Sequence, residues 1–221
     1  MGALFPGGTS LAAFLVASFV LAVTPGPGVV YIVARTLAQG RLAGLSSVAG
    51  VALGNLGNAL GASLGLAALF AVSATAFTVV KFVGATYLVY LGWQVFRRPA
   101  SGADAPFVPQ AHAARIFREG FFVALLNPKT ALFFAAFLPQ FIDATAAPMA
   151  QTVALGAVFV LVAACTDSAY VWLATWLSPL LRRGSCAPAL GPLAVAAVYI
   201  GLGVWTLFAE TRAGAGRAAQ P

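Results

Sequence analysis

The chain has 221 residues, of which 61% are hydrophobic and 8% are charged, and its mean hydropathy is +0.95. This composition excludes an ordinary soluble globular protein and predicts an integral membrane protein. The formal net charge of +7 does not indicate nucleic-acid binding, because the arginines stand singly or in pairs between apolar runs, with no basic stripe interleaved with aromatic residues.

Six apolar runs follow one another along the chain, and each is long enough to cross a bilayer, which takes about 20 residues. They cover residues 11–34, 44–71, 77–96, 118–140, 149–178 and 190–209. The first, third and fifth links would lie on one side of the membrane and hold eight arginines. The other links would lie on the opposite side with the two termini, and together they hold two arginines. The positive-inside rule therefore predicts six transmembrane helices with both termini outside. The eight arginines are Arg35, Arg41, Arg97, Arg98, Arg115, Arg118, Arg182 and Arg183.

The first run is interrupted by "TPGPG" at residues 24–28, in which Pro25 and Pro27 alternate with Gly26 and Gly28. Proline removes a backbone hydrogen bond and clashes with the preceding turn, so this segment predicts an unwound stretch within the membrane. A half-helix that begins after it would present unpaired N–H groups to a carboxylate. The alternative is a structural kink that Thr24 or a neighbouring helix satisfies.

The second run carries glycines at positions 50, 54, 57, 61 and 65, which fall on one face of a helix. Small residues let another backbone approach closely, so this is a packing face, either within the bundle or in a homodimer. Asn55 and Asn58 in the same run are expected to form hydrogen bonds between helices or to reach a cavity.

Residues 97–117 form the one candidate linker, and they divide the chain into halves at about 11–96 and 118–209. The last runs of the halves, "VGATYLVYLGWQVF" (83–96) and "VAAVYIGLGVWTLF" (195–208), align without a gap and share five residues. Three helices per half require the halves to be inverted relative to each other. The predicted fold is thus all-α, a single transmembrane transporter domain over 1–221 with six helices as two inverted three-helix repeats.

The fourth run contains "NPK" at residues 127–129, a second proline break at the place that corresponds to the first. Lys129 lies about halfway along this run, and Asp167 lies near the middle of the fifth. Each charge costs roughly 2.5–3.5 kcal/mol at the bilayer centre, so the two are expected to be partners or to reach water. In a functional interpretation, Asp167 holds a substrate ammonium or exchanges a proton, while Lys129 holds a carboxylate or compensates Asp167. In the alternative, they form a structural ion pair.

The sequence contains no set of residues typical of an enzyme or a cofactor site. The only histidine, His112, stands alone in a polar link, so no Ser/His/Asp set exists. The two cysteines have neither metal-ligand spacing nor a Cys-x-x-Cys pair. We therefore expect neither catalytic activity nor a cofactor.

Three stretches resemble the LysE/RhtB family of bacterial amino-acid exporters. They are "AVTPGPG" (22–28), "KFVGATYLVYLGWQVFRR" (81–98) and "FREGFFVALLNPKTALFFAAFLPQFI" (117–142). The resemblance covers about residues 11–209 and implies a multi-pass carrier of the bacterial inner membrane that exports amino acids or close derivatives, driven by the proton gradient. The family's motifs fall on Thr24, Pro25, Gly26, Pro27, Asn127, Pro128 and Lys129, and burial cost adds Asp167 to this set of substrate-binding candidates.

We therefore expect a secondary transporter that works by alternating access, with an amino acid and protons as its ligands and the lipid bilayer as its surroundings. Two alternatives remain open at this stage. One is the export of a metal ion or another small solute, and the other is a non-transporting membrane scaffold that uses the glycine face of the second helix.

Overall fold

The computed structural model describes residues 5–64, 74–96, 112–143 and 147–182, together with residues 197, 200, 201 and 204. Every regular element within these ranges is helical, which confirms the predicted all-α class. Most of the predicted linker and of the sixth run lies outside the described residues.

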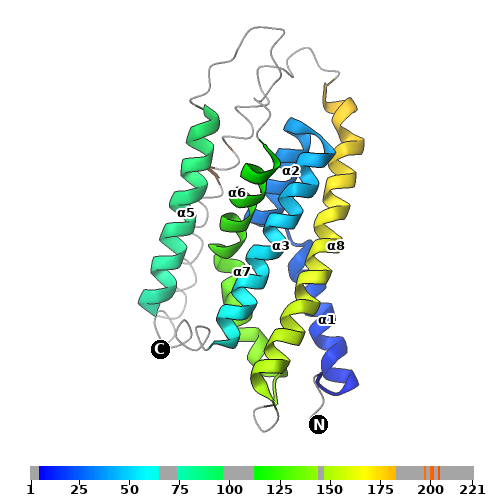
Figure 1. The fold of residues 1–221 in the computed structure, drawn as a ribbon, viewed down its shortest axis with the longest axis vertical. Coiled ribbons are helices and arrows are strands. Elements are labelled where there is room, and N and C mark those ends of the chain that lie inside the picture. The colour runs from blue at the N-terminus through cyan, green and yellow to red at the C-terminus, as the bar shows by residue number, and fades with distance from the viewer. Residues whose placement is uncertain are drawn as a thin grey trace, which may run out of the picture.

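The elements follow the predicted runs, but the first and fourth runs are each divided in two. In chain order they are α1 (Gly8–Val23), α2 (Pro27–Gln39), α3 (Arg41–Ser63), α5 (Ala74–Phe96), α6 (Ala113–Leu125), α7 (Pro128–Leu132), the π-helical η1 (Phe133–Phe137), the 3-10 helix η2 (Leu138–Phe141) and α8 (Pro148–Arg182). Figure 1 shows that α1 and α2 run in one direction, α3 returns, and α5, α6 with α7, and α8 continue the alternation. This is the order that short loops between membrane crossings require.

Three of the predicted spans meet the length and hydropathy expected of a membrane crossing. Among the described residues, Pro148–Pro179 of α8 qualifies alone, while α1 with α2 and α6 with Pro128–Phe141 qualify as bent pairs, with bends of 49° and 46°. The six spans and the inverted repeat stay predictions, because the last helix of the second half falls mostly outside the described ranges.

The described arginines of the predicted inner side gather at one end of the bundle. Arg41 begins α3, Arg35 lies in the last turns of α2, Arg115 and Arg118 lie at the start of α6, and Arg182 ends α8. These helix ends lie together at the top of Figure 1, whereas α1 begins at the opposite end. The distribution agrees with the predicted orientation, and we call this end the basic end.

The glycine face of α3 packs against α6 of the same chain. A Cβ atom on Gly50 would lie 2.1 Å from the carbonyl oxygen of Phe117, and one on Gly54 would lie 2.4 Å from that of Phe121. Only glycine permits such an approach of two backbones. Of the two predicted uses of this face, the structure shows packing within the bundle at Gly50 and Gly54; the homodimer stays a prediction.

Candidate functional site

The first break is produced by two residues that each precede a proline. Thr24 and Gly26 have extended backbones, with φ/ψ of −66°/116° and −142°/−173°. The residue before a proline is pushed out of the helical region, so two consecutive steps of this kind end α1 at Val23 and delay the start of α2 until Pro27. The predicted unwound stretch is confirmed.

The second break has the same local cause. Asn127 precedes Pro128 and is extended, with φ −80° and ψ 110°, which separates α6 from α7. The Oδ1 atom of Asn127 accepts a hydrogen bond of 3.1 Å from the backbone N–H of Lys129. Asn127 is therefore the N-cap of α7, and Pro128 occupies the first helical position, where its missing N–H has no cost.

The carbonyl groups that the first break leaves without helical partners are satisfied by side chains from α7 and α8. The Lys129 ammonium donates to the carbonyl oxygens of Leu21 and Thr24, at 2.7 and 2.6 Å. The Tyr170 hydroxyl donates to the carbonyl oxygen of Val23 at 2.7 Å. In lipid an unpaired carbonyl costs several kcal/mol, so these contacts hold the break open.

Tyr170 was missed from the sequence. The available signal was its position three residues after Asp167, which places the two side chains on neighbouring positions of one helix face.

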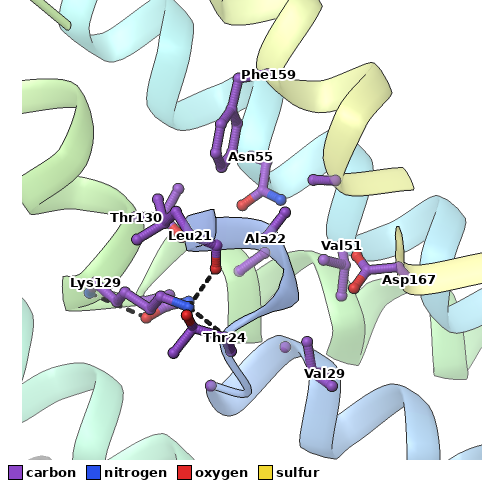
Figure 2. Close-up of a pocket in the computed structure, with 15 residues that line it drawn as sticks. Leu21, Ala22, Thr24, Val29, Val51, Asn55, Lys129, Thr130, Phe159 and Asp167 are labelled. Carbon is purple, nitrogen blue, oxygen red and sulfur yellow. Dashed lines mark hydrogen bonds between the residues drawn. The ribbon is translucent and has the colours of Figure 1, made fainter. Parts of the chain in front are cut away.

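Both breaks border one cavity in the middle of the bundle (Figure 2). Its volume is about 40 Å³ for the centres of water-sized spheres, which suits a few water molecules and is too small for a whole amino acid. The structure brings together five of the eight predicted site residues here: Thr24, Gly26, Asn127, Lys129 and Asp167. The other three, Pro25, Pro27 and Pro128, shape the breaks but do not line the cavity.

Two further polar side chains line the cavity and were not among the predicted site residues. Asn55 of α3, which we expected to reach a cavity or a neighbouring helix, is 6% exposed, and Thr130 of α7 is 5% exposed. Asn58 instead donates a hydrogen bond of 2.9 Å to the carbonyl oxygen of Ala124 and joins α3 to α6. The rest of the lining is mainly apolar, with Val29, Val51, Phe159 and Ala163 among its members.

The structural ion pair between Lys129 and Asp167, which was the alternative interpretation, does not form. Figure 2 shows the two side chains entering the cavity from different helices, Lys129 from α7 and Asp167 from α8, with the ammonium turned to the end of α1. Asp167 is 5% exposed, and neither a hydrogen bond nor an ion pair joins its carboxyl group to any described residue. The two charges share a cavity but not a contact, because the carbonyls freed by the break compete for the lysine.

A polar network closes the bundle between the cavity and the basic end. The buried Glu119 of α6 accepts hydrogen bonds from Arg35 of α2 and, at 2.8 Å, from Nε of Arg115. The Tyr31 hydroxyl lies 3.1 Å from the same carboxyl group and 2.8 Å from the carbonyl oxygen of Ile116. Arg35 and Glu119 lie eight residues from Pro27 and Asn127, or about 12 Å along each helix.

Aromatic side chains fill the bundle on the other side of the cavity. Phe14 of α1 and Phe133 of η1 have ring centroids 6.1 Å apart, and Phe133 lies 4.9 Å from Phe159 of α8. These rings are buried. The cavity therefore lies between the polar network on one side and the packed rings on the other.

Within the described ranges, no group of three or more His, Cys, Asp or Glu side chains is placed to hold a metal ion. Metal-ion export, the first of the alternatives, therefore receives no support from the cavity.

Comparison with known proteins identifies a family and several relatives. Residues 19–209 match the LysE type translocator family. The chain is 31% identical over 192 residues to an uncharacterized membrane protein of Vibrio cholerae, which covers 87% of this chain and 93% of that protein. It is 34% identical over 172 residues to the homoserine/homoserine lactone efflux protein of Salmonella typhimurium, covering 77% and 82% of the two chains.

A more distant relative is the leucine efflux protein of Salmonella typhimurium, at 30% identity over 140 residues, or 60% of this chain and 63% of that protein. No solved structure matches the chain significantly.

Proposed function

The chain belongs to the LysE type translocator family, and we propose that it is a secondary transporter that exports an amino acid or a close derivative across the bacterial inner membrane. Membership makes it a translocator in the membrane and not an enzyme. The observation that carries the proposal is the meeting of two proline-broken helices at one cavity that is lined by the buried Asp167 and the partly buried Lys129. Relatives that export homoserine and leucine support the substrate class.

The cavity offers the kinds of group that a small dipolar solute needs. The α2 helix begins at its edge with Gly26 as an N-cap that has no side-chain partner, so backbone N–H groups and the positive end of the helix dipole face inward. Asp167 supplies a negative charge from α8. A zwitterion can place its carboxylate at the N-terminus of α2 and its ammonium at Asp167.

Alternating access is supported by the two closures on either side of the cavity. The Arg35–Glu119 contact joins α2 to α6 toward the basic end, and the packed rings of Phe14, Phe133 and Phe159 close the opposite side. Since the cavity is smaller than an amino acid, substrate entry would have to widen it by separating one of these two sets of contacts. We propose that the polar network opens toward the cytoplasm and the aromatic cluster toward the outside, each in turn.

Protons are the proposed driving ligand. Asp167 is an acid at membrane depth with no partner among the described residues, and such a group can gain and lose a proton as the cavity changes sides. Exchange of one proton for one substrate at this carboxyl group would link export to the inward proton gradient.

The test is transport by the purified protein in liposomes. Vesicles loaded with labelled leucine or homoserine should release the label faster when an inward proton gradient is applied, with the outside more acidic than the inside, than when no gradient is present. The Asp167→Asn variant should lose at least about 90% of this release, while Asp143→Asn, an equal change at an exposed aspartate, should keep it. Normal release by Asp167→Asn at equal protein content would remove Asp167 from the mechanism.

The same assay addresses the second alternative, a non-transporting scaffold. A scaffold would give no release of any solute in the panel, even with the wild-type chain. The part of the glycine face at Gly50 and Gly54 packs against α6, so less of it is left for a partner protein.

A further inference from the structure

The two charged side chains that line the cavity, the partly buried Lys129 and the buried Asp167, differ in how well they are satisfied. The Lys129 ammonium already donates to two carbonyl oxygens at the end of α1, where the helix dipole is negative. Asp167 has 5% exposure and makes no hydrogen bond or ion pair with the described part of the chain. The charge in the cavity that still requires a counter-charge is thus the negative one.

From this difference, and resting on the proposed export function, we infer that the transporter recognises its substrate by the ammonium group, which binds Asp167, and that the substrate carboxylate is dispensable. Lys129 is then a positioning residue: it holds the end of α1 at the break and does not anchor the carboxylate. The substrate class is small primary amines with a short, largely apolar body, whether their carboxyl group is free or is masked as an amide, an ester or a lactone.

Apart from Lys129, the lining has no positively charged side chain for the other end of the substrate, and only the partial charge of the α2 dipole favours a carboxylate there. Asn55 and the first N–H groups of α2 are uncharged donors. An uncharged donor binds the carbonyl oxygen of an amide or ester as well as it binds a carboxylate oxygen, apart from the charge-assisted part of the bond. By contrast, loss of the substrate ammonium would leave Asp167 buried and unpaired, which is the costlier change.

The titratable groups that face Asp167 across the cavity are few. Among the lining residues, α7 contributes Lys129, and α1, α2 and α3 contribute no ionisable side chain. Glu119 and Arg35 are not part of the lining. Substrate ammonium and proton therefore share one carboxyl group, and each should exclude the other from it.

The experiment uses the full chain in liposomes loaded with labelled leucine or homoserine, with unlabelled leucine, leucinamide or N-acetyl-leucine outside. Leucinamide keeps the ammonium and lacks the carboxylate, and N-acetyl-leucine has the reverse pattern. We expect leucinamide to exchange with the label within about threefold of leucine, and N-acetyl-leucine at least about tenfold less well, because an uncompensated buried charge costs more than 1.4 kcal/mol. Equal or better exchange by N-acetyl-leucine would overturn the inference.

Two variants separate the role of Asp167 from that of Lys129. Asp167→Asn should remove the preference for leucinamide over N-acetyl-leucine. Lys129→Gln should lower the rate for every substrate, because the end of α1 is loosened, but should leave the ratio of leucine to leucinamide unchanged. A selective loss of leucine in Lys129→Gln would show instead that Lys129 anchors the carboxylate.

The outcomes for this inference and for the proposed function are distinguishable. If neither labelled amino acid moves with any external solute, the proposed function fails, and the inference fails with it. If an amino acid moves but leucinamide is rejected, export stands and ammonium recognition alone is wrong.

Discussion

The close approach of α3 to α6 makes Gly54→Ala a sharp test of the fold. The added Cβ atom would lie 2.4 Å from the carbonyl oxygen of Phe121, 2.7 Å from Cβ of Ala124 and 3.0 Å from the backbone nitrogen of Leu125. Van der Waals contact needs about 3.5 Å, so the two helices would have to separate locally by about 1 Å. Two of the three obstacles are backbone atoms, which cannot turn aside as a side-chain end can.

The expected cost follows from these contacts. Overpacking of a tight site costs about 1–3 kcal/mol, and the upper end applies where backbone must move. Replacing a helix-interior glycine by alanine stabilises the helix by about 1 kcal/mol, so the net fall in the free energy of unfolding is about 2 kcal/mol. For a chain of this size that corresponds to a fall in Tm of roughly 4–8 °C.

The assay is thermal unfolding of the purified protein in detergent, with two matched controls. Gly57→Ala lies on the same face, but its Cβ atom would meet only the flexible end of Leu125, at 3.0 Å, so a smaller loss is expected. Gly8→Ala meets no atom within 4 Å and should leave Tm unchanged. If all three variants unfold at the same temperature, the α3–α6 packing described above is refuted. A change of oligomeric state in Gly54→Ala without loss of stability would instead support the predicted homodimer through this face.

Three further predictions concern the breaks and the basic end. Tyr170→Phe keeps the ring but leaves the carbonyl oxygen of Val23 without its donor, so it should lower stability by about 1–3 kcal/mol in the same unfolding assay; an unchanged Tm would show that the bond is not needed. Glu119→Gln removes the counter-charge of the buried Arg35, so a cysteine placed on the cavity wall should react faster with a reagent added at the basic end, and equal reactivity would argue against a closure there. Alanine at both Pro25 and Pro128 frees the preceding residues to become helical, so transport should fall sharply, and full transport would mean that the breaks serve only as kinks.

The breaks were predictable because their cause is local. An X-Pro step restricts the residue before it whatever the rest of the fold does, so Thr24 and Asn127 could be placed outside helices from the sequence alone. The glycine spacing predicted a packing face for the same kind of reason. It could not identify the partner helix, since the residues of α6 that meet Gly50 and Gly54 are Phe117 and Phe121, 67 positions further along the chain, and only the folded bundle selects them.

The partner of Lys129 could not be predicted, because similar depth in the membrane does not fix which side chains meet. We expected the two charges to be partners or to reach water, since the sequence shows side-chain charges but not the acceptors that a broken helix exposes. Once the first break is formed, its carbonyl oxygens lie within reach of α7 and accept hydrogen bonds from the ammonium.

The Arg35–Glu119 network was missed for a different reason: Arg35 was treated only as an orienting charge, although Glu119 is the one acidic residue in the fourth apolar run.

The position of Lys129 explains why "TPGP" and "NPK" need each other although they are about 100 residues apart. A lysine alone at this depth costs roughly 2.5–3.5 kcal/mol, and each carbonyl left unpaired in lipid costs several kcal/mol more. When the ammonium donates to Leu21 and Thr24, each motif removes the penalty of the other. Either motif without its partner would be destabilising in a membrane helix, so the same contact that stabilises the first break also fixes α1 against α7 at the cavity. In the proposed alternating access, any movement of α1 relative to α7 must therefore either keep this contact as a pivot or replace it with water or substrate.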